Sequence, residues 1–296
     1  MKLTNQHLGQ LEFDHFHHLG FSTNSKDIKS LFQDVKFVCL SGSVDRVFNY
    51  AKFVNSKLKM VKEDDLVDLC STDRYSMYKV GPILIANHGM GVPSACIILN
   101  ELFKLLHYAG ANDVTFFRIG TCGGLGLEPG TVVLTKRSVN GLLLPKHSQV
   151  VLGNVVEYDT TFEHGLSEEV LSLAKEEKAQ FDFDVVIGDT MCSDDFYEGQ
   201  ARLDGAFCPY SRKDRDEFLE RAYENGVRNI EMESLVFASM CIRAGVKACI
   251  VCVVLVNRLN DKDQILISKE RVKEFEARPG DLVFEFMKQH LNLNDG

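Results

Sequence analysis

The sequence lacks the features that mark several classes of protein. None of its apolar runs is long enough to span a membrane, and its first residues, MKLTNQHLGQ, contain no signal-peptide core. Basic residues are not in excess, since the formal net charge is −9 at pH 7. Nucleic acids and acidic membrane surfaces are bound mainly by basic patches. We therefore expect a cytoplasmic protein whose partners include no nucleic acid and no membrane.

The cysteines do not form a recognisable metal or disulfide pattern. There are nine of them, an odd number, scattered mostly in apolar runs, as is typical of buried free thiols in a reducing compartment. Cys249 and Cys252 form a C-x-x-C pair, but within the strand-like run KACIVCVVLV, where this spacing points the thiols to opposite faces. No second pair stands at zinc-finger spacing. We predict no metal site.

What the sequence does contain is an alternation of strand-like and helix-like segments. Apolar runs typical of buried strands cover residues 35–40, 83–87, 114–119, 131–135, 184–188 and 247–256. Segments typical of helices cover residues 94–110, 166–180, 234–245 and 268–291. Buried strands separated by helices indicate a layered α/β fold with a mainly parallel sheet. Since there is no low-complexity linker, internal repeat or break in composition, we expect one domain.

The stretch FFRIGTCGGLG places an arginine near the end of a predicted strand, just before a glycine-rich turn. Gly120, Gly123 and Gly124 would allow positive φ and close approach of a ligand to backbone N–H groups. Arg118 adds a cation and Thr121 a hydroxyl, and together they suit an anion such as phosphate. A tight turn with Arg118 paired to a core carboxylate explains this stretch alone equally well. A Rossmann loop is not expected, because no G-x-G-x-x-G follows the strand.

Three further stretches combine turns with polar residues. Gly42 and Arg46 follow a strand in VKFVCLSGSVDR, which is also explained as a strand–helix connection with a solvated arginine. Arg74 lies in TDRYSMYKVG, which alone is typical of a surface segment. In NHGMGVPSA the glycines let a strand turn sharply into the next helix, and this conformational role is sufficient.

Two stretches suit a small polar organic ligand. In DDFYEGQARLDGA, Gln200 offers a carbonyl and an amide, Arg202 offers donors only, and Phe196 offers a stacking face. This set suits a flat heterocycle with carbonyls and an N–H. In NIEMES, Glu231 and Glu233 stand at a strand–helix junction, where a carboxylate could accept two hydrogen bonds from a sugar diol. Capping of the helix N-terminus by acids is the favoured interpretation of NIEMES in isolation.

Taken together, these stretches resemble the uridine phosphorylases of the nucleoside phosphorylase family, especially those of animals. The likeness runs from about residue 15 to residue 290 and is carried by motifs in this order: HGMGVPS, RIGTCGGLGLEPGTVV, DFYEGQARLDGA, EMES and VNR. It implies a single-domain three-layer α/β/α fold with a mixed, mainly parallel twisted central sheet over residues 1–296, in which residues 1–15 are peripheral. It also implies reversible phosphorolysis of uridine to uracil and ribose 1-phosphate in pyrimidine salvage, with phosphate as co-substrate and no cofactor.

The resemblance assigns a role to each matching residue. Phosphate would be bound by Gly42, Arg46, Arg74, Arg118 and Thr121. Uracil would be bound by Gly123, Phe196, Gln200, Arg202 and Arg258. Ribose would be bound by His18, Thr121, Met232 and Glu233, with His17 as the alternative to His18. Those implied to be catalytic are Arg118, Thr121, Gln200, Arg202 and Glu233.

The resemblance also bears on subunits and metals. It implies a homo-oligomer, in the animal type a homodimer, in which Arg74 and His18 complete the site of the neighbouring subunit. Some bacterial relatives bind an alkali cation through a glutamate, but Tyr75 stands at that position here, so no metal site is carried over.

The charges of the reaction fit this residue set. Breaking the glycosidic bond builds positive charge on the sugar and negative charge on the base, which phosphate on one side and Gln200 with Arg202 on the other would stabilise. Another nucleoside phosphorylase, for purines or for thymidine and deoxyuridine, and a non-catalytic relative are the alternatives. Against a purine enzyme, the segment VLVNR has no acid to protonate N7.

Overall fold

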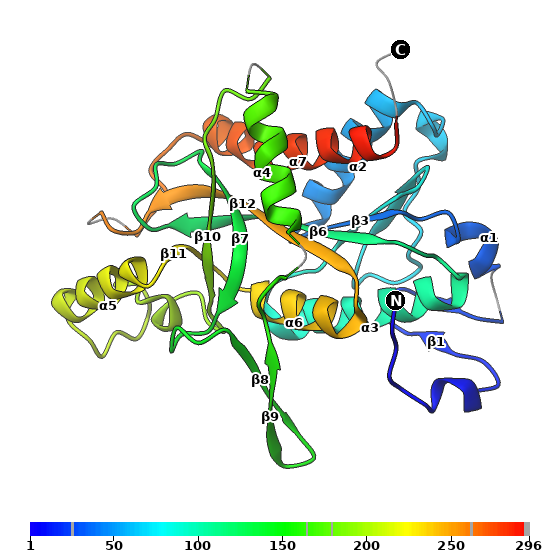
Figure 1. The fold of residues 1–296 in the computed structure, drawn as a ribbon, viewed down its shortest axis with the longest axis horizontal. Coiled ribbons are helices and arrows are strands. Elements are labelled where there is room, and N and C mark those ends of the chain that lie inside the picture. The colour runs from blue at the N-terminus through cyan, green and yellow to red at the C-terminus, as the bar shows by residue number, and fades with distance from the viewer. Residues whose placement is uncertain (25–26, 164, 179, 261–262, 293–296) are drawn as a thin grey trace. The chain divides into compact units, whose positions relative to one another are not determined.

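The computed structural model describes residues 1–24, 27–163, 165–178, 180–260 and 263–292 (Figure 1). The chain falls into two compact units, which we describe separately. The first comprises Met1–Arg118 and Met240–Ala248, and the second comprises Ile119–Ser239 and Cys249–Gly296. Three elements carry the chain from one unit to the other: β6 (Thr115–Gly124), α6 (Ser234–Ala244) and β12 (Lys247–Asn257). The expectations of one domain and of a peripheral segment at residues 1–15 stay predictions.

The first unit is built on a mixed sheet in the order β4–β5–β3–β6. Strand β3 runs parallel to β5 and β6, whereas β4 is antiparallel to β5. All residues of β3 and β5 are buried, which explains their uninterrupted apolar character. The elements of this unit that precede β6 are η1 (Leu8–Gln10), β1 (His15–Phe16), β2 (Phe21–Ser22), α1 (Ile28–Phe32), β3 (Phe37–Ser41), α2 (Val44–Leu58), η2 (Glu63–Asp65), β4 (Met77–Val80), β5 (Ile83–Asn87) and α3 (Gly91–Ala109).

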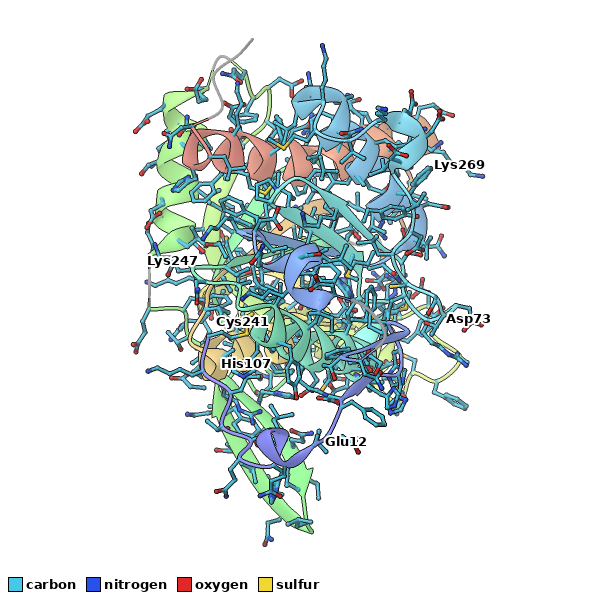
Figure 2. The ribbon with its side chains drawn as sticks, turned by 90° about the vertical axis from the view of Figure 1, so that its right-hand side faces the viewer. Glu12, Asp73, His107, Cys241, Lys247 and Lys269 are labelled. Atoms are coloured by element: carbon cyan, nitrogen blue, oxygen red, sulfur yellow. The ribbon has the colours of Figure 1, made fainter. Side chains whose placement is uncertain are left out.

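Local sequence signals set the helix ends of this unit. Gly89, just before α3, and Gly91, its first residue, have φ of +69° and +82°, so the predicted sharp turn from strand into helix is confirmed. The same helix ends at Gly110 in the left-handed region, as predicted. Charged side chains such as Glu12, Asp73 and Lys247 lie exposed on the unit's surface (Figure 2).

The second unit contains a mixed sheet in the order β11–β10–β7–β12. Strand β10 is parallel to β11 and β7, and β12 is antiparallel to β7. A β8–β9 hairpin projects away from the rest of the unit (Figure 1). The remaining elements of the second unit, after β6 and besides α6 and β12, are β7 (Val132–Val139), β8 (Lys146–Val151), β9 (Asn154–Asp159), α4 (Leu166–Glu176), β10 (Val185–Cys192), η3 (Glu198–Gln200), α5 (Arg212–Glu224), β11 (Val227–Glu231) and α7 (Lys269–His290). The described residues include no helix that is both long and apolar enough to cross a membrane.

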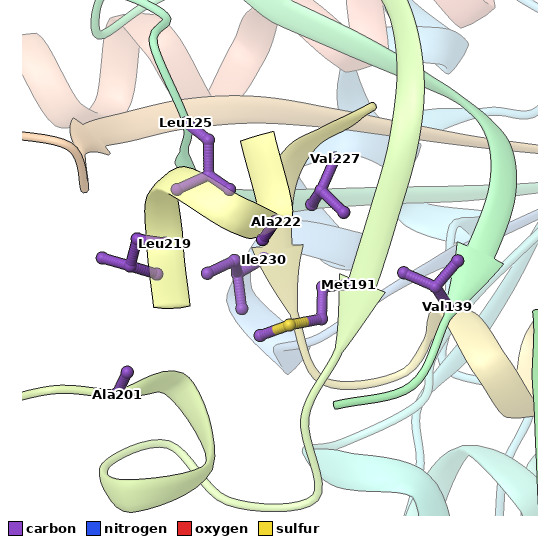
Figure 3. Close-up of a cluster of buried hydrophobic side chains, with 8 residues drawn as sticks. All are labelled: Leu125, Val139, Met191, Ala201, Leu219, Ala222, Val227 and Ile230. Carbon is purple, nitrogen blue, oxygen red and sulfur yellow. The ribbon is translucent and has the colours of Figure 1, made fainter. Parts of the chain in front are cut away.

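An apolar cluster of the second unit includes Ala201, in the segment that follows η3 (Figure 3). Most of its members come from β7, β10, α5 and β11, among them Met191, Leu219 and Ile230, and Leu125 comes from the segment after β6. Ala201, directly after η3, contributes its buried methyl group at the edge of this cluster. Burial of such side chains contributes about 1.5–3 kcal/mol each for the larger ones. The cluster therefore anchors the η3 segment at Ala201.

The prediction of a glycine-rich turn after Arg118 is wrong. All of β6 is described, and it continues as a strand through Gly124, with no positive φ among its glycines. A Cβ on Gly123 would lie 2.8 Å from Cγ of Arg258, and one on Gly124 would lie 2.7 Å from Cγ1 of Val254. Side chains pack so closely on this strand that a methyl group at either position would clash. Close packing, rather than a turn, requires these glycines.

Candidate active site

The first unit brings together the glycine and two of the arginines predicted to bind phosphate. Strand register pairs Leu40 of β3 with Arg118 of β6, so Gly42 follows directly at the carboxyl end of β3 beside Arg118. A Cβ on Gly42 would lie 3.9 Å from Nη2 of Arg46. Arg118 is buried, and Arg46 lies in the first turn of α2, whose N-cap Ser43 accepts a hydrogen bond from the Arg46 N–H. Two cations and a helix N-terminus beside a bare glycine suit a phosphate dianion.

His88 is a polar residue of this region that sequence reasoning did not single out. Its side chain is buried, with Cε1 3.8 Å from the position of a Cβ on Gly42. Its backbone N–H donates to Ser41 O at 2.8 Å. The motif HGMG contained the signal, but we attributed that motif only to the turn before α3. His88 therefore belongs to the surroundings of the candidate phosphate site.

The residues predicted to serve the neighbouring subunit, His18 and Arg74, lie on one exposed area of the first unit. The carboxylate of Glu101 on α3 holds the His18 segment, with Nδ1 of His18 2.6 Å from Oε1 and the Leu19 N–H donating to Oε2 at 2.9 Å. Thr72 donates its hydroxyl to His18 O and accepts from the Arg74 N–H at 3.4 Å. The Arg74 side chain is 71% exposed. Its guanidinium is therefore exposed, and the Thr72 hydroxyl links the backbone of Arg74 to that of His18.

The structure distinguishes the two neighbouring histidines. The ring of His17 is exposed and stacks on His15 at 5.5 Å between centroids. The ring of His18 instead lies 6.4 Å from Tyr75, the residue after Arg74, and its side chain is 41% exposed. The His18 ring therefore contacts the residue after Arg74, and the choice of His18 over His17 stays a prediction. Tyr75 itself is buried and donates its hydroxyl to Ser94 O at 2.8 Å.

The second unit presents the predicted base-binding residues on the η3 segment. Between Gln200 and Arg202, Ala201 adopts φ of +53°, a left-handed conformation that is uncommon for a residue with a side chain. The Arg202 N–H donates to Tyr197 O at 3.0 Å, which closes this tight segment. The Gln200 side chain is buried, and its amide makes no hydrogen bond within the described part of the chain. No described residue therefore occupies its donor or its acceptor.

Several neighbours hold Arg202. Its Nε and Nη2 donate to the two oxygens of Asp204 at 2.8 and 2.6 Å. Its guanidinium lies 4.6 Å from the ring centroid of Phe196, and Tyr210 donates its hydroxyl to Arg202 O at 2.6 Å. The hydrogen bonds from Arg202 hold the pKa of the Asp204 carboxyl below its ordinary value. The ring predicted to stack on uracil thus lies over the arginine that is predicted to bind it.

Arg258 is fully buried at the end of β12. Its Nη2 donates to Gln200 O at 2.9 Å, and its Nε donates to Asp263 at 3.0 Å. Its Nη1 has no hydrogen-bond partner among the described residues and lies 3.9 Å from the position of a Cβ on Gly123. Arg258 therefore braces the η3 segment from within and keeps one donor beside Gly123.

The two acids of NIEMES have different surroundings. Glu231, the last residue of β11, accepts hydrogen bonds from the N–H groups of Glu233 and Ser234 at 2.9 Å each, so the predicted helix cap is confirmed for this residue. Glu233 is buried and Met232 is partly exposed in the same turn. Thr121 is half-buried on β6, and Gly123 on the same strand pairs with Ile230 just before this turn. The predicted ribose-binding residues Thr121, Met232 and Glu233 therefore belong to adjoining parts of this unit.

Comparison with known proteins identifies the family. Residues 36–288 match the Phosphorylase superfamily. The chain is 46% identical over 293 residues to uridine phosphorylase 2 of Homo sapiens, an alignment that covers 98% of this chain and 91% of that one. A crystal structure of uridine phosphorylase from Schistosoma mansoni in complex with thymidine is 43% identical and aligns over 100% of both chains with a TM-score of 0.94. The chain belongs to the Phosphorylase superfamily, and the predicted nucleoside phosphorylase fold with its mixed sheet is confirmed.

One similar protein carries a different name. "Inactive uridine phosphorylase B" of Schistosoma mansoni is 41% identical over 288 residues, covering 97% of this chain and 96% of that one. Overall similarity therefore does not by itself separate an active enzyme from an inactive relative, and activity has to be argued from the site residues.

Proposed function

We propose that this protein is a uridine phosphorylase, a pentosyltransferase that converts uridine and phosphate reversibly into uracil and ribose 1-phosphate. The observation that carries this proposal is the η3 segment. There the buried Gln200 side-chain amide makes no hydrogen bond to another described residue, and Arg202 is fixed in orientation by Asp204. An amide can accept from N3–H and donate to a ring carbonyl of uracil at once, and arginine donates to a carbonyl. Cytosine and purine bases present a different arrangement of hydrogen-bond donors and acceptors.

The phosphate residues support the reaction type. In the proposed mechanism, a phosphate oxygen attacks C1′ of the ribose while the bond from C1′ to N1 of uracil breaks, and the bonding electron pair leaves with the base. Gly42, Arg46, Arg118 and Thr121 would hold the phosphate dianion, which in turn stabilises the developing positive charge on the sugar. Fixed charges and positioned reactants would supply the main catalytic contribution.

The leaving base needs the opposite stabilisation. Gln200 and Arg202 would stabilise the negative charge that uracil acquires, and the unpartnered Nη1 of Arg258 beside Gly123 offers a further donor. Phe196 would stack on the base, while Met232 and Glu233 would bind the ribose. The proposed chemistry needs inorganic phosphate as co-substrate and no cofactor.

We also propose that the protein acts in the cytoplasm, in pyrimidine salvage, as a homodimer. The adjacent, exposed positions of His18 and Arg74 support a site to which each subunit contributes these two residues for its partner. His18 would then reach the 5′-hydroxyl of the nucleoside in the partner's site, and Arg74 would reach the inorganic phosphate bound there.

A phosphorolysis assay tests the function directly. Base release is followed by absorbance for uridine, thymidine, cytidine, inosine and adenosine, each with and without phosphate. We expect phosphate-dependent cleavage of uridine and poor cleavage of cytidine, inosine and adenosine. Faster cleavage of inosine than of uridine would indicate a purine enzyme. A folded protein that cleaves none of these nucleosides would be a non-catalytic relative.

A further inference from the structure

We infer that Asp263 is a positioning residue for base recognition: its buried carboxylate fixes the segment that carries Gln200 and Arg202. This inference rests on the proposed function of that segment. Asp263 follows β12 in the chain and did not stand out in the sequence, because it belongs to no motif.

Donors from three parts of the second unit converge on this one carboxylate. Nε of Arg258 donates to Oδ1 at 3.0 Å, and Nη2 of Arg215 on α5 lies 3.3 Å from the same oxygen. The backbone N–H of Leu203 donates to Oδ2 at 2.9 Å. Asp263, Arg215 and Arg258 are all buried, so water does not compete for these hydrogen bonds.

The network reaches both predicted base-binding residues through the backbone. Arg258, whose Nε is held by Asp263, donates from Nη2 to Gln200 O at 2.9 Å. Leu203, held directly by Asp263, is the residue after Arg202. The carboxylate therefore holds the base-binding segment on both sides of the strained Ala201, through Gln200 O and through the Leu203 N–H.

The charge of Asp263 is as important as its geometry. Two permanent cations, Arg215 and Arg258, share it inside the protein, and Arg215 Nη2 also donates to Arg258 O at 2.7 Å. Without the carboxylate the two buried arginines would repel each other with no anion between them. Arg258 would then be displaced, and with it the contact to Gln200.

Asparagine at position 263 removes this function with little change in volume. Its amide offers one oxygen, whereas the donors of Arg258, Arg215 and Leu203 require both oxygens of the carboxylate. Its NH₂ group must face a donor whichever way the amide is turned. Asp263→Asn therefore breaks at least one of the links to the base-binding segment.

Asp216→Asn is the matched control. Asp216 accepts from Nη1 of the same Arg215 at 2.6 Å, but its side chain is 40% exposed. Among the described residues it accepts no hydrogen bond from the η3 segment. The experiment compares wild type, Asp263→Asn and Asp216→Asn in KM and kcat for uridine and for phosphate, and in KM for uracil in the reverse reaction with ribose 1-phosphate.

For Asp263→Asn we expect kcat/KM for uridine to fall about 10- to 100-fold and KM for uracil to rise, because the base-binding groups are displaced. The phosphate KM should stay within about twofold, as should all constants of Asp216→Asn. A merely structural role would lower the amount of active enzyme without changing the uracil KM. An unchanged uracil KM, or an equal rise in the phosphate KM, would overturn the inference.

Arg215→Lys provides a second test if Asp263→Asn does not fold. Lysine keeps the charge, but its one ammonium group has three donors and cannot serve all four acceptors of Arg215, which are Arg258 O, Asn260 O, Asp263 and Asp216. For Arg215→Lys we expect a smaller rise in the uracil KM than for Asp263→Asn, with the phosphate KM unchanged. Equal uracil KM values in Arg215→Lys and wild type would overturn the inference. A wild-type protein with no uridine phosphorolysis would instead contradict the proposed function itself.

Discussion

Arg202 and Asp204 form a two-pronged ion pair, with Nε donating to Oδ1 at 2.8 Å and Nη2 donating to Oδ2 at 2.6 Å. This geometry fixes the plane of the guanidinium, because both bonds must be satisfied together. Among the described residues the Nη1 group of Arg202 has no hydrogen-bond partner, so we expect it to face a ligand. Asp204 thus orients an arginine that we expect to read a carbonyl of uracil.

The Asp204 pair predicts a pH dependence of stability. The pKa of the Asp204 carboxyl is lowered, chiefly by the hydrogen bonds from Arg202. The carboxylate therefore stabilises the folded state fully at pH values above the unfolded pKa of about 3.9. This contribution is lost as the pH falls through the lower folded value. Asp204→Asn should therefore lower the free energy of unfolding by about 1 kcal/mol at neutral pH. Urea titrations should give the same difference near pH 5 and a shrinking one below pH about 3.9. A difference that grows on acidification would contradict this account of the pair.

Gly123→Ala should move Arg258. The new Cβ would lie 2.8 Å from Cγ and 3.2 Å from Cδ of Arg258, and overpacking of this kind costs about 1–3 kcal/mol. We expect a lower melting temperature and about a tenfold loss in kcat/KM for uridine, because Arg258 holds Gln200 O. Gly141→Ala is the control, since a Cβ on Gly141 meets nothing within 4 Å. Equal activity of the two variants would show that this close contact is not required.

Arg118→Ala should reduce turnover without unfolding the protein. Loss of one charge-assisted donor from a buried phosphate site costs about 3 kcal/mol of transition-state stabilisation, or about 100-fold in rate. The exposed Arg271, paired with Glu274 on α7, offers a control in Arg271→Ala. Circular dichroism checks the fold, and kinetics at varied phosphate give KM and kcat. Wild-type values for folded Arg118→Ala would remove Arg118 from the phosphate site.

A mixing experiment tests whether sites are shared between subunits. Arg74→Ala and Arg118→Ala should each be nearly inactive, but a mixed dimer should contain one site with both arginines intact. We expect mixing to restore part of the wild-type activity, in proportion to the heterodimer measured by native mass spectrometry. Heterodimers without activity would mean that Arg74 does not serve the partner's site.

The fold was largely predictable because its signals are local. Buried strands such as Ile83–Asn87 and the helix that ends at Gly110 follow from apolar runs and from one glycine. Helix α5 was missed although Ser211 and Asp214 form a capping box, a signal that the sequence does contain. The β8–β9 hairpin was missed because many of its residues are polar or exposed on both faces.

The site was predictable in its residue types and less so in its geometry. Patterns in the sequence indicated Gln200 and Arg202, but they could not show that Arg258 is buried beneath them or that Asp263 holds it. Such contacts join residues far apart in the chain. Gly123 and Gly124 illustrate the same limit. Close packing by Arg258 and Val254 requires these glycines, and no local sequence pattern indicates such packing.

The most direct test of base recognition is the substitution Gln200→Leu. Leucine has a similar volume but can neither accept from N3–H nor donate to a carbonyl, so polar groups of uracil would be buried without partners at about 1–3 kcal/mol each. The measurement is kcat/KM for uridine and for inosine in wild type and Gln200→Leu, with phosphate binding measured separately. We predict that Gln200→Leu loses nearly all uridine phosphorolysis while it still binds phosphate, and that wild type prefers uridine. Near-normal uridine kcat/KM in Gln200→Leu, or faster cleavage of inosine by wild type, would contradict the assignment of this protein to pyrimidine phosphorolysis.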